Sequence, residues 1–299
     1  LEMYGKHYSI AWPHEESSSA RPLRRSPLYD RLKNAGACFG EKLGWERANW
    51  FAAGSLKARD PIDAYGFEHQ PWFDAVAQEH HAVRRKVGLF DQSSFAKFLV
   101  TGQGAQAGLQ WLCANDVGVS PGRVVYTQLL NTRGGIECDL TIVVLSPERY
   151  YIVTGTGFAT HDLDYLTRGL RETADAQISE VTSGYSVLSL FGPNARALLE
   201  SLDVQGIGND TFPFASARDI ALRGTRILAL RISYVGELGW ELHIPTEFTL
   251  SVYDQIIEAG QTFGLRNCGY RAIESLRLEK GYRAWGADIT ADTTPYEAG

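Results

Sequence analysis

Several features that would identify a protein class at once are scarce or missing in this chain of 299 residues. Its 4 cysteines include no CxxC pair, so the usual ligand spacing of a structural zinc site is missing. No apolar run approaches the ~20 residues that a membrane-spanning helix needs. The chain has 29 basic and 35 acidic residues, and its net charge of −6 argues against non-specific nucleic-acid binding, which needs a basic surface.

The cysteines and the two ends of the chain indicate the kind of protein that it comes from. The cysteines lie far apart, which predicts reduced thiols in an intracellular protein rather than disulfides. The first six residues lack the apolar centre of a signal peptide, and the first residue is Leu. The last residues are turn-like and form no closing element, so we expect a piece of a longer protein.

Residues 1–75 differ in composition and periodicity from the rest of the chain. They are rich in Trp, Tyr, Arg, Pro and Ser and show little periodicity. Only Leu28–Ala35 is typical of a helix, with Ser26 as the expected N-cap and Pro27 at the first helical position. Because so few regular elements cannot form a core, we expect this part to pack against the rest of the chain or against an upstream domain.

From about residue 78 the pattern predicts an α+β fold, with antiparallel sheets and flanking helices in two similar sub-domains. Three successive strands at 124–130, 136–145 and 150–154 are typical of an antiparallel meander and break the alternation of a parallel doubly wound sheet. A turn is expected at 90–94, and further strands at 96–100, 186–191, 226–235 and 240–244. Helices are expected at 79–87, 105–113, 161–171, 193–202, 248–259 and 270–280.

A faint internal repeat supports two similar sub-domains. The strand Phe98–Gly102 runs into a helix at Ala105, and about 90 residues later Ser189–Gly192 runs into a helix at Ala195. The first copy also matches G-x-G-x-x-A, but no acidic residue follows where a dinucleotide site needs one, which favours a simple strand-to-helix turn. We expect no metal site, since adjacent His80 and His81 would point about 100° apart on a helix.

Asp139 is the first candidate site residue. On a strand, Glu137, Asp139 and Thr141 share one face, whereas the intervening residues form an apolar face. Asp is unfavourable in strands, so Asp139 is either a solvated strand-end charge or a placed carboxylate.

The segment Tyr234–Glu241 is the second candidate. Glutamate carboxylates beside aromatic faces suit a flat heterocycle with N–H donors, although a β-turn with aromatic cross-strand packing explains the same residues. Arg271 stands in the first turn of a helix, where the dipole disfavours a cation. It could bind an anionic or carbonyl-bearing ligand, or form a surface ion pair with Glu274.

Three motifs, in the same order, resemble the aminomethyltransferase (T-protein) of the glycine cleavage system. They are Tyr126-Thr127 with Asn131–Leu140, Tyr234–Leu242, and Arg271–Gly281 followed by Gly286 and Asp288. Two departures stand out. T-proteins usually have Asp-Asp where this chain has Cys138-Asp139, and an Asn-containing segment where it has 154–157.

Four earlier stretches resemble the dimethylglycine and sarcosine dehydrogenases, in which an FAD oxidase module precedes a T-protein-like folate module. They are Tyr8–Pro13, Arg24–Tyr29, Phe39–Phe51 and Phe90–Lys97. The resemblance implies that residues 1–75 are the end of the FAD-dependent module with a linker. It implies that residues 76–299 are a folate-binding module without its C-terminal barrel.

The resemblance also implies a chemistry, with tetrahydrofolate as cofactor and FAD in the module upstream. An N-methyl amine is oxidised to an iminium, and tetrahydrofolate captures its carbon as 5,10-methylenetetrahydrofolate. Asp139 matches the carboxylate beside the folate amines, and the implied folate contacts are Glu241, Arg271, Tyr234 and Tyr126. No nucleic-acid or membrane partner is implied. The expected location is the cytoplasm of a bacterium or the mitochondrial matrix of a eukaryote.

An alternative remains open at this point. The same fused architecture occurs in a regulatory subunit of a mitochondrial phosphatase, so a non-catalytic interaction role is the rival interpretation.

Overall fold

The computed structural model describes residues 2–53, 61–173 and 175–299. The strands are β1 (Ala37–Lys42), β2 (Trp45–Phe51), β3 (Val87–Asp91), β4 (Ala96–Thr101), β5 (Val124–Leu130), β6 (Ile136–Ser146), β7 (Arg149–Thr154), β8 (Gln177–Glu180), β9 (Tyr185–Phe191), β10 (Ser216–Leu222), β11 (Thr225–Arg231), β12 (Gly239–Pro245) and β13 (Leu265–Asn267). The helices are α1 (Glu2–Gly5), α2 (Tyr29–Asn34), α3 (Phe73–Arg85), α4 (Ala105–Leu112), α5 (Ala159–Thr173), α6 (Ala195–Ser201), α7 (Thr249–Gly260), α8 (Tyr270–Glu279) and α9 (Pro295–Ala298). Short 3₁₀ turns follow several of these elements.

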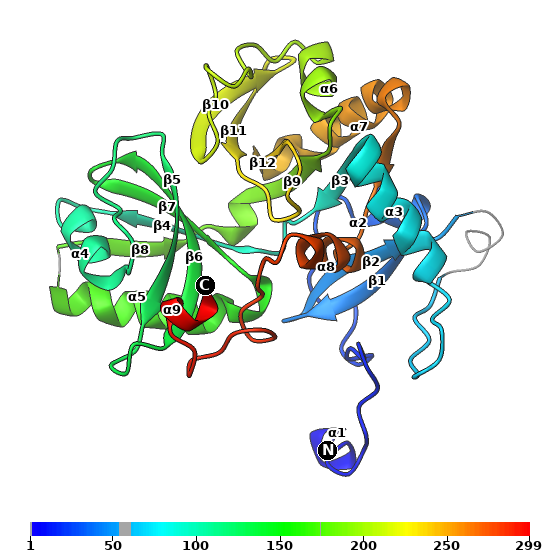
Figure 1. Cartoon of the computed structure of the whole chain (residues 1–299), viewed down its shortest axis with the longest axis horizontal. Helices are drawn as coiled ribbons and strands as arrows, with labels where there is room; N and C mark the ends of the chain where they lie inside the picture. Colours follow the sequence, from blue (N-terminus) through cyan, green and yellow to red (C-terminus); the bar gives the residue numbers. More distant parts are fainter. Residues whose placement is uncertain (1, 54–60, 174) are drawn as a thin grey trace.

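The strands form two large sheets and a small hairpin (Figure 1). One sheet has the order β5-β6-β7-β4-β8, the second has the order β10-β11-β12-β9-β3-β13, and β1 pairs with β2. All pairings are antiparallel except that of β13 with β3. The expected α+β class with antiparallel sheets and flanking helices is therefore confirmed.

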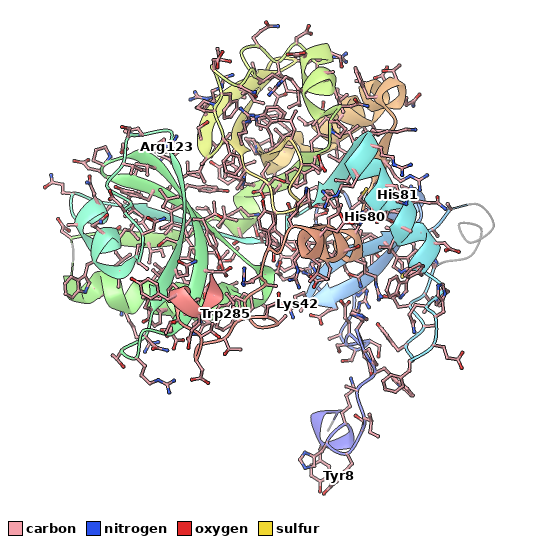
Figure 2. All side chains as sticks on the ribbon, viewed as in Figure 1. Tyr8, Lys42, His80, His81, Arg123 and Trp285 are labelled. Atoms are coloured by element: carbon pink, nitrogen blue, oxygen red, sulfur yellow. The ribbon has the colours of Figure 1, made fainter. Side chains whose placement is uncertain are left out.

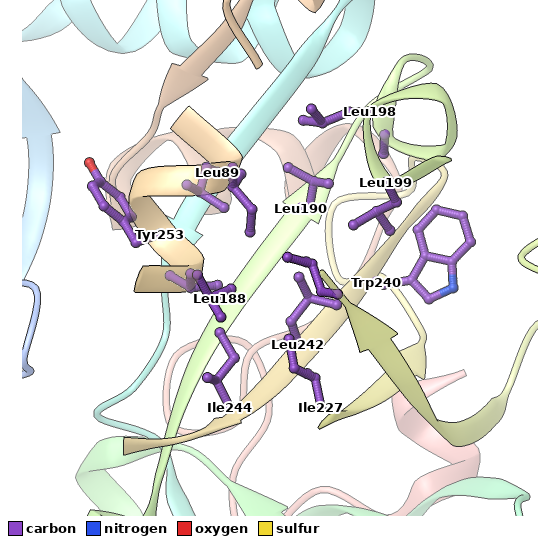
Figure 3. Packing of buried hydrophobic residues seen from close by; sticks show 14 of the residues in the cluster. Leu89, Leu188, Leu190, Leu198, Leu199, Ile227, Trp240, Leu242, Ile244 and Tyr253 are labelled. Atoms are coloured by element: carbon purple, nitrogen blue, oxygen red, sulfur yellow. The ribbon is translucent and has the colours of Figure 1, made fainter. Parts of the chain in front are cut away.

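In each large sheet, helices cover one of the two faces. In the five-stranded sheet, alternate residues of β6 pack with α4 and α5: Cys138, Leu140, Ile142 and Val144. In the six-stranded sheet, Trp240, Leu242 and Ile244 of β12 point into a cluster formed with α6 and α7 (Figure 3). The period-2 alternation of apolar residues that predicted these strands is thus the alternation between a helix-covered face and the opposite face.

The opposite faces of the two sheets pack against each other. Val124, Val143 and Tyr151 of the five-stranded sheet join Ala217 and Leu230 of the six-stranded sheet in one buried cluster. The remaining side chains on these two faces therefore point into the space between the sheets or to its margins.

The internal repeat is present in the backbone. Gly102 after β4 and Gly192 after β9 have φ values of +132° and +139°, and each carbonyl accepts the backbone N–H three residues on, at 3.0 Å. A Cβ on Gly102 would lie 2.6 Å from the Asp175 carbonyl oxygen, and one on Gly192 would lie 2.4 Å from that of Lys86. Close backbone approach explains these glycines, as the interpretation of a strand-to-helix turn requires.

The N-terminal part contains structure that the sequence did not reveal. β1 and β2 form a hairpin that packs on α8 and α3, and Trp50 joins a buried cluster with residues of both helices. The hairpin buries its aromatic residues against later elements rather than in a core of its own, so local periodicity is weak.

Several expected boundaries were wrong. The strand expected at 226–235 ends at Arg231. α2 begins at Tyr29, and the Ser26 hydroxyl donates to Asp91 at 2.5 Å instead of capping the helix. α3 begins six residues before the expected Glu79 and ends at Arg85. The expected turn at 90–94 overlaps β3, which pairs with β9 and β13, both far away in the sequence. Such long-range pairing leaves no local signal.

All four cysteines are free thiols, and Cys38, Cys138 and Cys268 are buried. Within the described residues, no helix combines the length and apolarity needed to cross a membrane.

A buried carboxylate ties β2, α3 and α8 together. Glu79 of α3 is fully buried, and it accepts the backbone N–H groups of Phe51 at 2.7 Å and Gly269 at 2.8 Å. Burial raises its pKa to about 7, while the two N–H bonds act in the opposite direction. The carboxyl group therefore holds a proton in the folded chain at a pH where it is ionised in the unfolded chain.

This shift predicts a pH dependence of stability. Between the unfolded pKa of about 4.5 and the folded pKa of about 7, the native state binds more protons. The free energy of unfolding should fall with rising pH across this window, by up to roughly 3 kcal/mol. In Glu79→Gln this contribution should vanish, at a pH-independent cost of about 1–3 kcal/mol for the lost acceptor. Urea unfolding at several pH values measures both.

Asp74→Asn, at an exposed position of the same helix, is the control and should run parallel to the parent. If Glu79→Gln also ran parallel to the parent, the raised pKa would be contradicted.

Candidate functional site

Asp139 and Tyr126 lie together on the face of the five-stranded sheet that is turned to the second sheet. Asp139 is on β6 and Tyr126 on the neighbouring β5, and the Tyr126 hydroxyl donates to Asp139 Oδ2 at 3.2 Å. Burial raises the pKa of Asp139, while the Tyr126 hydrogen bond acts in the opposite direction. Asp139 is thus a partly desolvated carboxylate with one fixed donor, not a freely solvated strand-end charge.

Tyr234 lies on the opposite side of the same space. Its hydroxyl donates to the Arg283 carbonyl at 2.7 Å, and its ring stacks on that of Tyr282 with centroids 5.9 Å apart and planes at 14°. Burial raises the pKa of Tyr234 to about 12, and the negative charge of Asp139 adds to this rise. The structure therefore brings Asp139, Tyr126 and Tyr234 into one electrostatic environment.

The segment after α8 closes this side of the site. Buried Arg277 of α8 donates to the Tyr282 carbonyl at 2.8 Å and pairs with Asp288 and Glu274. Further on, the Trp285 indole N–H donates to the Ile136 carbonyl at the start of β6, at 2.7 Å (Figure 2). The segment therefore joins the helix to the strand that carries Asp139.

The sequence analysis did not single out Arg277, Tyr282 or Trp285. The only available signal was that the third motif continues to Gly286 and Asp288. Asp288 proves to be the residue that holds the segment on Arg277.

Glu241 approaches from the second sheet. It lies on β12, is 8% exposed, and shares its face with His243, whose Nε2 is 3.7 Å from Glu241 Oε2. Its neighbour Trp240 points the other way, into the cluster with α6 and α7. The expected density of aromatics around Glu241 is therefore split between the two faces of the strand.

Arg271 has different partners from those expected. Its guanidinium pairs with Asp63 at 2.8 Å and lies 4.1 Å above the ring of Trp72, both in the N-terminal part. Glu274, the alternative partner, pairs with Arg277 instead. Arg271 thus fastens the segment before α3 to α8, and the structure shows no contact between it and Asp139, Tyr126, Tyr234 or Glu241.

A surface hollow of about 300 Å³ adjoins the 234–241 segment. It is lined by Phe214, Arg231, Ile232, Ser233, Gly236, Glu237, Leu238, Gly239 and Tyr282. Tyr282, whose ring stacks on that of Tyr234, is one of these lining residues, whereas Asp139 and Glu241 do not line the hollow.

Cys138 belongs to a separate cluster on the helix-covered face. Donor atoms of Cys138, His161 and Asp162 lie within 4.8 Å of one another, a combination that can hold a metal ion. The Asp162 carboxylate already accepts from the Thr154 hydroxyl and is bonded to His161 Nδ1 at 2.9 Å. Burial, followed by the charge of Asp162, raises the pKa of the Cys138 thiol. Hydrogen bonds within the cluster account for these side chains.

The orientation of Cys138 bears on the departure from the T-protein pattern. Because successive residues of a strand alternate, Cys138 and Asp139 face opposite sides of the sheet. A cysteine at this position leaves the face of Asp139 unchanged.

Comparisons with known proteins place the chain in a family. A family model described as the GCVT N-terminal domain matches residues 28–299. The chain belongs to the aminomethyltransferase (GCVT) family. A second model, the FAD dependent oxidoreductase central domain, matches residues 1–26. The two family models therefore meet at residues 26–28. The domain boundary near residue 75, which the composition suggests, stays a prediction.

The chain is similar to mitochondrial sarcosine dehydrogenase of Homo sapiens, with 37% identity over 100% of the chain and 36% of that protein. It is 33% identical to an aminomethyltransferase of Halothermothrix orenii, over 93% of the chain and 71% of that protein. The crystal structure of glycine cleavage system aminomethyltransferase T from Bartonella henselae is 28% identical, with a TM-score of 0.75 over 91% of the chain and 67% of that chain. The resemblance and the fold expected from it are confirmed. The chain spans about a third of the length of the dehydrogenase.

The Tyr126–Asp139 bond predicts a change in the titration of Asp139. Tyr126→Phe removes the donor that favours the ionised carboxylate, so the pKa of Asp139 should rise further. Carboxyl ¹³C NMR of the aspartates as a function of pH measures the shift.

Tyr165→Phe is the matched control, because the Tyr165 hydroxyl donates to the Leu130 carbonyl on the helix side of the sheet. An unchanged Asp139 titration in Tyr126→Phe would show that the hydroxyl does not govern this carboxylate.

Proposed function

We propose that this chain is the tetrahydrofolate-dependent one-carbon transfer module of an FAD-dependent N-methyl amino acid dehydrogenase or oxidase, and that it forms 5,10-methylenetetrahydrofolate. The observation that carries the proposal is the placement of two carboxylates on facing sheets, Asp139 with its tyrosine donor on one and Glu241 on the other. Membership of the aminomethyltransferase family and the similarity to sarcosine dehydrogenase support it.

Glu241 is the proposed anchor for the pterin ring. An ionised carboxylate accepts two parallel N–H bonds, and the aminopyrimidine edge of a pterin offers two adjacent N–H donors. Glu241 lies on the face of its sheet that is turned to the five-stranded sheet, so the proposal places the flat ring on that side. Tyr234 and Tyr126 supply aromatic surface and hydroxyl groups at the margins of this space.

Arg271 also remains a proposed folate contact, carried over from the resemblance. Its NH2 group is held by Asp63, whereas its Nε is buried without a hydrogen-bond partner among the described residues. This Nε–H is therefore a buried donor without a partner, which a ligand could use.

Asp139 is the proposed catalytic residue. FAD, bound by the upstream module of such an enzyme, supplies oxidation of the N-methyl amine to an iminium. Tetrahydrofolate would then supply both of its amines to this carbon: the first adds as the C=N pair moves onto the substrate nitrogen, and the second displaces the demethylated amine. The first addition would place positive charge on the attacking folate nitrogen. Of the two N–H protons that the folate loses, one departs with the amine and the other is released. The Asp139 carboxylate stabilises that charge and can take up the proton that leaves. Its pKa, raised by burial, suits proton transfer better than that of a fully solvated aspartate.

Sarcosine and dimethylglycine are the proposed type of amine, on the basis of the relatives' names. For the whole protein we propose a fused upstream FAD module and an intracellular location, in the mitochondrial matrix if the source is a eukaryote.

The decisive variant is Asp139→Asn in the enzyme that carries its FAD module. The shape of the side chain is kept and its charge is lost, so transfer to folate should slow by on the order of 10²-fold. Amine oxidation should continue at nearly the parent rate, because it takes place in the other module. Free formaldehyde, released when the iminium is hydrolysed, should therefore rise as methylenetetrahydrofolate falls. Both products are measured in one assay.

Glu137→Gln is the matched control, since Glu137 lies on the same strand and face but bonds to Asn131. It should partition carbon as the parent does. An Asp139→Asn enzyme with the parent's yield of methylenetetrahydrofolate would remove Asp139 from the mechanism. A parent protein with no saturable tetrahydrofolate binding by calorimetry would favour the non-catalytic interaction role instead.

A further inference from the structure

A row of three buried side chains crosses from one sheet to the other. Tyr151 of β7 lies opposite His243 and Glu241 of β12, and the three are 3%, 0% and 8% exposed. The Tyr151 hydroxyl is 2.9 Å from His243 Nδ1, and His243 Nε2 is 3.7 Å from Glu241 Oε2. The proposed pterin anchor is therefore the last member of a row that begins on the opposite sheet.

The surroundings of this row favour one placement of its protons. Among the described residues, the Tyr151 hydroxyl has one hydrogen-bond partner, His243 Nδ1, and donation to that nitrogen keeps the buried phenol proton bonded. Burial raises the pKa of Tyr151 well above 10 and lowers that of His243, which keeps the phenol protonated and the imidazole neutral. A neutral imidazole that accepts at Nδ1 carries its hydrogen on Nε2.

That Nε2–H is directed toward Glu241. His243 Nε2 is buried and has no hydrogen-bond partner in the described part of the chain. Glu241 Oε2 lies 3.7 Å from this nitrogen, which is too far for a hydrogen bond, but it is a carboxylate acceptor on the same side. A small movement of the Glu241 side chain closes this gap, as polar contacts in ligand-free sites often close on binding.

The surroundings of the row keep the imidazole neutral. Buried Lys97 of β4 donates to the carbonyls of Ser93 and Tyr185, both at 2.8 Å, and its charge opposes protonation of His243. The positions beside His243 on the adjoining strands are apolar: Val187 on β9 and Leu228 on β11. Beside Glu241 they are Ser189, whose hydroxyl is bonded to Gln92, and Leu230. No other charged group in the described chain is paired with this imidazole.

We propose that His243, held in its Nε2–H form by Tyr151, is a positioning residue for Glu241. Its N–H orients the carboxylate, so that the remaining lone pairs face a ligand with two adjacent N–H donors. The identity of that ligand as tetrahydrofolate rests on the proposed function. The state of the histidine does not.

The first test observes the histidine directly. In ¹⁵N-histidine-labelled protein, His243→Gln identifies the signal of His243 among the 7 histidines. We expect a neutral ring with the hydrogen on Nε2 in the parent, and loss of this single form in Tyr151→Phe. A hydrogen on Nδ1 in the parent, or an unchanged spectrum in Tyr151→Phe, would overturn the proposal whether or not the chain binds folate.

The second test measures tetrahydrofolate affinity by calorimetry in Tyr151→Phe and in the matched control Tyr150→Phe. Tyr150 is also buried, but it lies on the helix-covered face, where its hydroxyl is bonded to the Val117 carbonyl. Loss of the Tyr151–His243 hydrogen bond should weaken tetrahydrofolate binding about five- to tenfold, which is the usual contribution of one hydrogen bond. Tyr150→Phe should bind tetrahydrofolate as the parent does.

The outcomes of the two tests are distinct. Equal losses in both tyrosine variants would mean a general packing effect and would contradict the positioning role. If the parent shows the expected histidine form but binds no folate, the proposed function is refuted. The Nε2–H form of His243 and its bond to Tyr151 then still stand.

Discussion

The apolar contact between the two large sheets is the constraint on which the rest of the structure depends. Each sheet uses one face to pack against its own helices, so its other face has to be covered by the second sheet. Val143 and Leu230 lie in this contact. The polar side chains on the same faces, Asp139 and Glu241 among them, are then turned toward the facing sheet, and both are partly or largely buried. The electrostatics of the site follow from this packing rather than from any local motif.

The five-stranded sheet and its carboxylate were the parts most open to prediction. The meander at 124–154 carries a strong period-2 pattern and clear turn residues, and its strands pair as expected. The same pattern placed Asp139 on the face opposite to the apolar residues of β6, where the structure has it. The sequence predicts this part well because the alternation of apolar and polar residues along a strand follows directly from which face of the strand is buried.

Other parts depend on pairings between distant segments and left no local signal. The hairpin of β1 and β2 is buried against α8, and β3 pairs with strands more than ninety positions away, so a turn was expected where a strand lies. Arg271 could be placed on its helix, but its partner Asp63 lies 208 positions earlier in the chain. The role of His243 could not be predicted either. A histidine in an apolar strand is typical of a buried residue, and its partner Tyr151 is distant in the sequence.

We propose that tetrahydrofolate binds between the two sheets and contacts both. Hydrogen exchange followed by mass spectrometry, with and without tetrahydrofolate, tests it most directly. We expect slower exchange on both sides at once, in the segment 232–241 and in the segments 126–139 and 281–287, with α3 unchanged. Protection confined to one sheet, or none in any of these segments at saturating tetrahydrofolate, would contradict the claim.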